Sequence, residues 1–265
     1  MDRRAFTQAA VAALAASGAA GKANAAPDGK KAEIPPPPAE KFTIGMILFA
    51  NMTTLDYAGP ADVFARVQAA KVHTLAKTRD PLVSDTGNRV LADMTLAEAP
   101  DLDMIFIGGG PGATALMDDA EMISFLQARA PKAQWVTSVC TGALVLGAAG
   151  LLRGYKAATH WAAMDVLPLM GAIPTAERVV IDRNRITGGG VTAGIDFGLT
   201  VVGQLWGRQT AELIQLGAEY DPHPPFNAGS PRTAPPEAVE RFRTVIAKQT
   251  EARTAAAKRA AAKFA

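Results

Sequence analysis

Cys140 is the only cysteine in the 265-residue chain, and the residue types around it favour nucleophilic chemistry. An apolar run over residues 135–139 ends at Cys140, and the small residues 141–143 follow at once. A buried strand that turns directly into a helix gives this pattern, and a turn that tight excludes larger side chains. Because the helix begins beside the sulfur, we expect its amino end to favour the thiolate and to lower the thiol pKa below about 8.5. The alternative is a buried core cysteine, which is a common environment for this residue.

Four further positions are candidates for the groups that such a nucleophile needs. Asp56 is a candidate general acid/base, although an aspartate here can equally flank a helix. The backbone N–H groups of Gly110 and Thr141 are candidates for an oxyanion hole, and Thr141 could instead cap the helix. His160 is either a polar neighbour of the sulfur and of the substrate or a hydrogen-bonded core histidine.

Several other kinds of site are disfavoured by spacing and charge. The glycine-rich segment 108–112 lacks the complete Gly-x-Gly-x-x-Gly pattern of a dinucleotide loop and the Gly-Lys-Ser/Thr ending of a phosphate loop. The three histidines and the cysteine are widely spaced, which predicts no metal site. A net charge of +2 is too balanced to indicate nucleic-acid binding.

The elements that must position these residues alternate between strand and helix, which predicts an α/β fold of the flavodoxin-like kind. Its parallel sheet would carry helices on both faces. Strands are expected at 42–49, 72–76, 103–107, 136–139 and 155–159, with a hairpin over 178–187. Helices are expected at 59–70, 118–130, 161–170, 192–205 and 209–219 and directly after the cysteine. Because Asp56, Gly110, Cys140 and His160 each follow a strand, they should meet at the carboxyl edge of the sheet, where ligands bind.

The two ends of the chain differ in composition from the domain over residues 41–235. In residues 1–26, Arg3-Arg4 precede a weakly apolar run and Ala23-Asn24-Ala25, the order found in a twin-arginine signal. We therefore expect a periplasmic protein that is not membrane-bound after export, the alternative being a cytoplasmic protein with an Ala-rich tail. Residues 27–40 contain four consecutive prolines and predict a stiff linker. Residues 236–265 predict a helix and a basic Ala/Lys-rich tail, frayed or disordered over its last dozen residues.

Taken together, these motifs resemble those of the ThiJ/PfpI superfamily, the class I glutamine amidotransferase-like proteins, and within it the isonitrile hydratases. The resemblance covers residues 42–235. The segments that carry it are Leu55-Asp56-Tyr57-Ala58-Gly59-Pro60, Gly109-Gly110-Pro111-Gly112, Thr137-Ser138-Val139-Cys140-Thr141-Gly142, 149–154, Thr159-His160-Trp161, 182–196 and Pro225-Phe226-Asn227-Ala228-Gly229-Ser230-Pro231.

The resemblance implies hydration of a small isonitrile to an N-substituted formamide by a homodimeric enzyme that needs no cofactor. Cys140 would be the nucleophile, Asp56 an acid/base that is protonated at rest, and Thr141 a supporting polar group. Two departures argue against other activities of the superfamily. Protease-like members carry a histidine where this chain has Thr141, and no histidine here begins the His-x-Glu pair of glutamine amidotransferases.

Two other functions stay open at this stage. The same domain occurs as the ligand-sensing module of AraC-type regulators, in which a helix-turn-helix pair follows it. A stress protein that senses oxidants or handles reactive carbonyls could use the same cysteine.

Overall fold

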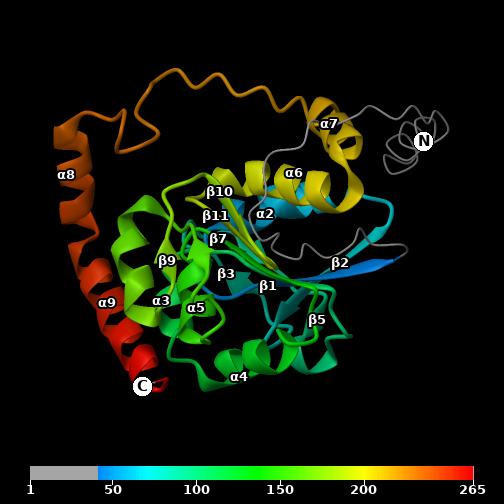
Figure 1. The fold of residues 1–265 in the computed structure, drawn as a ribbon, viewed down its shortest axis with the longest axis horizontal. Coiled ribbons are helices and arrows are strands. Elements are labelled where there is room, and N and C mark those ends of the chain that lie inside the picture. The colour runs from blue at the N-terminus through cyan, green and yellow to red at the C-terminus, as the bar shows by residue number, and fades with distance from the viewer. Residues whose placement is uncertain (1–40, 265) are drawn as a thin grey trace, which may run out of the picture.

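The computed structural model describes residues 41–264, so the predicted signal and linker lie outside the described residues. A seven-stranded sheet forms the centre of the molecule (Figure 1). Its order is β10 (Val179–Asp182), β11 (Arg185–Gly188), β7 (Trp135–Val139), β6 (Met104–Ile107), β1 (Phe42–Ile47), β2 (Ala70–Ala76) and β5 (Met94–Thr95). Every pair is parallel except β10 with β11. The predicted flavodoxin-like α/β fold is confirmed.

Helices cover both faces of this sheet (Figure 1). The first face packs against α2 (Thr54–Phe64) and α6 (Ala193–Trp206), which leads into α7 (Arg208–Gly217). The second face packs against α3 (Ala113–Leu116), α4 (Ala120–Arg129) and α5 (Gly142–Ala148). Side chains of β6 alternate between the two cores, with Phe106 in the first and Ile105 in the second. Because the central strands β6 and β7 are buried on both faces, they read in the sequence as largely apolar runs.

Shorter elements complete the chain. Two small sheets pair β3 (Leu82–Val83) with β4 (Arg89–Val90) and β8 (Lys156–Ala157) with β9 (Ile173–Pro174). The 3₁₀ helices are η1 (Leu96–Glu98) and η2 (Trp161–Met170), the second replacing a predicted α-helix. Within the described residues, no helix is both long and apolar enough to cross a membrane.

Helix α2 begins earlier than the sequence suggested. We expected Gly59-Pro60 to open it, but it starts at Thr54 and contains Pro60. The Asp56 N–H already donates to Thr53 O at 3.0 Å, so the first turn forms before the proline is reached. Proline has no N–H to donate, which removes a single bond of the following turn. Asp56 therefore lies in the first turn of a helix that points at the sheet edge.

The C-terminal segment is helical, which corrects the expectation of a frayed tail. Helix α8 (Pro236–Val245) is followed by α9 (Ala247–Ala262), which packs along η2 and α5 (Figure 1). Ala256, Ala257 and Ala260 are fully buried because their small side chains let the helix approach closely. Arg259 also forms an ion pair with Asp118 at 2.6 Å. The composition that suggested disorder is thus that of a closely packed helix.

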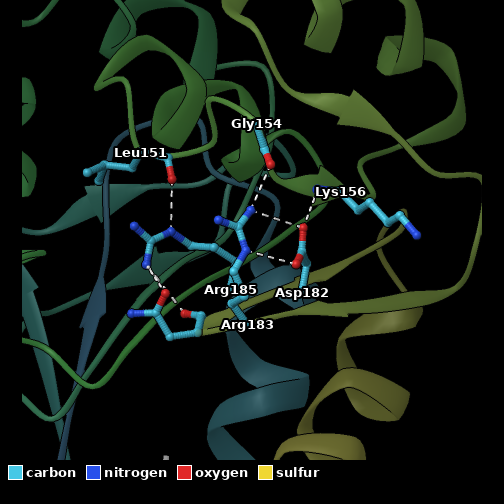
Figure 2. Close-up of polar contacts among 7 residues, drawn as sticks. Leu151, Gly154, Lys156, Asp182, Arg183 and Arg185 are labelled. Atoms are coloured by element: carbon cyan, nitrogen blue, oxygen red, sulfur yellow. Dashed lines mark hydrogen bonds and ion pairs between the residues drawn. The ribbon is translucent and has the colours of Figure 1, made fainter. Parts of the chain in front are cut away.

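The arginines of the 182–185 turn fasten the β10–β11 hairpin to the loop after α5 (Figure 2). Arg185 Nε donates to Leu151 O at 2.8 Å, and Arg183 Nη2 donates to Gly154 O at 2.7 Å. Asp182 accepts the Lys156 N–H at 2.7 Å. This motif is therefore structural, and it holds β11 beside β7, the strand that ends at the cysteine.

Candidate functional site

Cys140 occupies a sharp turn, or elbow, between β7 and α5. Its φ is +53°, in the left-handed region that non-glycine residues seldom adopt, and its side chain is buried at 4% exposure. The Cys140 N–H donates to Gly188 O at 3.1 Å and to Gly189 O at 2.8 Å, so β11 holds the strained residue in place. A cysteine held in this conformation indicates a functional constraint.

The small residue after the elbow is required by close packing. A Cβ at Gly142 would lie 2.3 Å from Ile107 O, because the start of α5 passes directly beneath the end of β6. This confirms the sequence-based expectation that a larger side chain would clash at the turn.

Asp56 reaches the elbow from the first turn of α2. It is completely buried, and its Oδ2 accepts the Gly109 N–H at 2.8 Å. Burial raises the pKa of Asp56 from 3.8 to about 6, against partial lowering by the Cys140 side chain and the Gly109 N–H. Its Oδ1 is also buried and has no hydrogen-bond partner of ordinary geometry within residues 41–264. The side-chain hydrogen bond between Asp56 and Cys140 places this carboxyl in direct contact with the thiol.

The thiol pKa moves in the direction opposite to the one expected. Burial, followed by the negative charge of Asp56, raises the pKa of Cys140 to about 12. The backbone N–H groups of Val191 and Thr141 lower it only in part. The expectation of a low thiol pKa is wrong, because a helix end of seven residues does not compensate for desolvation and an adjacent carboxylate. The larger rise in pKa belongs to the thiol, which favours a proton on sulfur over one on Asp56 at neutral pH, in contrast to the expectation that Asp56 holds it at rest.

The glycine-rich loop connects Asp56 to Thr141. The Gly110 N–H donates to Thr141 Oγ1 at 2.9 Å, and a Cβ on Gly109 would lie 2.4 Å from Thr141 N. The Gly110 N–H is thus already paired, whereas the Thr141 N–H is directed at the sulfur of Cys140. The loop packs as a spacer between the acid and the elbow, and the oxyanion role of Gly110 stays a prediction.

Val191 contributes a backbone N–H that the sequence analysis missed. Its amide is directed at the Cys140 sulfur, and its φ of +21° is unusual for a β-branched residue. The three consecutive glycines before it were visible in the sequence, but only the fold shows that this loop turns its N–H toward the cysteine.

His160 lies on the same cavity as the cysteine. This cavity has a volume of about 120 Å³, and Gly110, Cys140, Thr141 and His160 all line it. Burial and the charge of Arg253 lower the pKa of His160 to about 4, so the ring is neutral at pH 7. Its Nδ1 accepts the Ala162 N–H at 3.3 Å. The structure therefore brings together all five predicted site residues, with Asp56 directly behind the cavity wall.

The opposite wall of the cavity comes from the C-terminal helices, which the sequence analysis had left out of the site. It is lined by Phe242 of α8, by Ile246 at the junction of the two helices, and by Gln249 and Arg253 of α9. The Phe242 ring lies 6.1 Å from the His160 ring, centroid to centroid. No local pattern in the sequence indicated that residues a hundred positions beyond the cysteine would close over it.

Comparisons with known proteins place the chain in a family. The model of the DJ-1/PfpI family matches residues 43–204. An isonitrile hydratase from Pseudomonas putida is 49% identical over 221 residues, which cover 83% of this chain and 97% of the relative. A ThiJ/PfpI family protein from Pseudomonas syringae, with a solved structure, has a TM-score of 0.81 and 44% identity over 88% of this chain and 97% of its own. The transcriptional regulator GbdR of Pseudomonas aeruginosa is 29% identical over 68% of this chain and 51% of the regulator.

Proposed function

The chain belongs to the DJ-1/PfpI family, and we propose that it hydrates isonitriles, R–NC, to N-substituted formamides at Cys140. The observation that carries the proposal is the hydrogen-bonded pairing of a buried thiol with a buried carboxyl, beside a cavity that admits a small molecule. The 49% identity to an isonitrile hydratase supports the same reaction class.

In the first step, the sulfur and a proton both add to the terminal carbon of the isonitrile. Asp56, ionised at neutral pH, accepts the thiol proton as the sulfur attacks, and the same proton then passes to the carbon. The product is a thioimidate, R–N=CH–S–Cys140, and no atom is lost. The N–H groups of Thr141 and Val191, which point at the sulfur, stabilise the negative charge that develops there.

In the second step, water hydrolyses the thioimidate. The Asp56 carboxylate takes a proton from water as the hydroxyl adds to carbon, and this proton passes to the nitrogen. The tetrahedral adduct, R–NH–CH(OH)–S–Cys140, then breaks its carbon–sulfur bond. The hydroxyl proton returns to sulfur through Asp56, which releases R–NH–CHO and the original thiol. A carboxyl pKa of about 6 suits a group that must both take and give a proton near neutral pH.

The regulator-type alternative is less well supported by the described residues. The chain matches only about half of the length of GbdR. In this chain, α8 and α9 follow the matched region, and they contribute to the cavity over Cys140. A homodimer also stays a prediction, and it can be measured by light scattering during size-exclusion chromatography.

The test is formamide production from a small alkyl isonitrile such as ethyl isonitrile by the purified protein. We expect turnover by the wild type and by Asp62→Asn, a control that removes an exposed carboxylate from the same helix as Asp56. Asp56→Asn should lower kcat by about two to four orders of magnitude, the usual contribution of general acid/base catalysis. Cys140→Ser should be lower still, because a hydroxyl is a weak nucleophile at neutral pH. A folded wild type that produces no formamide from any isonitrile would overturn the proposed function.

A further inference from the structure

Arg253 is a buried cation inside the wall of the cavity. The residue is 6% exposed, and its Nε is buried without a hydrogen-bond partner in the described part of the chain. Burial lowers the pKa of its guanidinium, which nonetheless stays charged at neutral pH. Burying the Nε atom of a cation without a partner is costly, so an arginine at this position indicates that its charge has a role in the cavity that it lines.

No side chain of the described residues supplies that partner. None of the ion pairs within residues 41–264 includes Arg253. The acidic group of the site, Asp56, has its Oδ2 on the Gly109 N–H instead. Within the described residues, the electrostatic interactions of Arg253 are therefore those with the Cys140 sulfur and the His160 ring, both of which border the cavity.

The side chain borders the space in which the substrate must bind. Arg253 lines the same cavity as Cys140, and Gln249, one helical turn earlier on α9, lines it too. The electrostatic interaction between Arg253 and the Cys140 sulfur also shows that the two side chains are near each other. A molecule that places its reacting carbon on the sulfur can thus place an anionic group on the guanidinium.

We propose that Arg253 and Gln249 form a carboxylate-binding subsite, and that the isonitrile substrates of this protein carry a carboxylate close to the isonitrile group. This inference rests on the proposed function for the reaction, although the subsite itself does not. One guanidinium balances the single charge of a carboxylate and can bind its two oxygens in parallel. A phosphate, with nearly two charges, would be left partly unpaired, and the volume of about 120 Å³ favours a compact ligand.

The subsite lies outside the part of the chain that the family model matches. That model ends at residue 204, whereas Gln249 and Arg253 lie on α9. The cysteine, the acid and the glycine-rich loop thus come from the shared domain, and the selection of the R group comes from the C-terminal helix.

Binding can be measured without turnover. The probes are N-formylglycine, the hydration product of isocyanoacetate, and N-formylglycinamide, its neutral analogue of the same shape. By titration calorimetry, the wild type should bind the carboxylate roughly ten- to hundredfold more tightly than the amide, the range expected for charge-assisted hydrogen bonds. Arg253→Gln should remove this preference, and Arg253→Lys should keep part of it. Lys258→Gln, which removes an exposed cation from the same helix, should bind as the wild type does.

The kinetic comparison uses isocyanoacetate and isocyanoacetamide. We expect kcat/KM of the wild type to favour the carboxylate by a similar factor, and Arg253→Gln to lose activity toward the carboxylate alone. Equal losses toward both substrates would overturn the subsite, because they would make Arg253 a counter-charge for the sulfur. Equal binding of the two formyl compounds by the wild type would overturn it even if Arg253→Gln failed to fold. Arg253-dependent binding of N-formylglycine without turnover of any isonitrile would keep the subsite and reject the proposed function.

Discussion

Replacing Asp56 by asparagine should stabilise the protein at neutral pH while abolishing most of its activity. Burial raises the pKa of Asp56 from 3.8 to about 6, a shift of about two units. Since one unit corresponds to about 1.4 kcal/mol, ionised Asp56 lowers the free energy of unfolding at pH 7 by about 3 kcal/mol. Asparagine keeps an oxygen for the Gly109 N–H but carries no charge to bury.

The sign of the pH dependence follows from the raised pKa. Between about pH 4 and pH 6, the folded state binds a proton at Asp56 that the unfolded state has released, so stability from this group falls as pH rises through that window. Above pH 6 the penalty is constant. The difference in unfolding free energy between Asp56→Asn and the wild type should therefore grow by about 2 kcal/mol from pH 4 to pH 7, in favour of the variant.

The assay is urea unfolding followed by circular dichroism at several pH values between 4 and 8, with all proteins under the same conditions. Groups other than Asp56 titrate equally in the proteins compared and cancel in the difference. The control is Asp62→Asn on the same helix, because the Asp62 carboxylate is exposed and pairs with Arg66 at 2.9 Å. Its unfolding free energy should change with pH as that of the wild type does. If the unfolding free energy of Asp56→Asn also changed with pH as that of the wild type does, Asp56 would not be a buried, destabilising charge.

Three further predictions concern the thiol, the loop and the N-terminus. The rate at which iodoacetamide alkylates Cys140 should still rise above pH 9. Asp56→Asn should react faster than the wild type at pH 8, because the carboxylate charge raises the thiol pKa. A rate that reaches a plateau near pH 7 in the wild type would contradict this. Gly109→Ala should lose activity and about 1–3 kcal/mol of stability, because its Cβ would lie 2.4 Å from Thr141 N, and unchanged denaturation and turnover would show that the loop can move aside. We also propose export through Arg3-Arg4, with a mature N-terminus near Ala26 and loss of export in the double lysine variant; mass spectrometry of the periplasmic and cytoplasmic fractions decides, and an intact Met1 found only in the cytoplasm would reject it.

The sequence predicted the parts of the site that depend on local patterns. The apolar run before Cys140, the small residues after it and the alternation of strands and helices were sufficient for the elbow and for the sheet edge at which Asp56, Gly110 and His160 meet. These features were visible because strand periodicity and steric limits at a tight turn act over a few residues.

The features of the site that the sequence did not predict depend on contacts between distant segments. The thiol pKa was assigned from the adjacent helix, but burial and the charge of Asp56, 84 positions earlier in the sequence, decide its direction. The Val191 N–H reaches the sulfur through an unusual backbone angle that residue type does not reveal. Arg253 lies in a segment whose Ala/Lys-rich composition suggested a disordered tail, whereas its alanines pack it against η2 and α5.

Covalent catalysis by Cys140 is tested by observing the bond between its sulfur and the isonitrile carbon. Rapid mixing of the wild-type protein with an isonitrile labelled with ¹³C at the terminal carbon, followed by acid quench and peptide mass spectrometry, measures it. We expect an adduct that raises the mass of the peptide containing Cys140 by the whole isonitrile, and that decays as labelled formamide appears. Labelled formamide formed at full rate by Cys140→Ser, or formed by the wild type while Cys140 stays unmodified throughout, would contradict it.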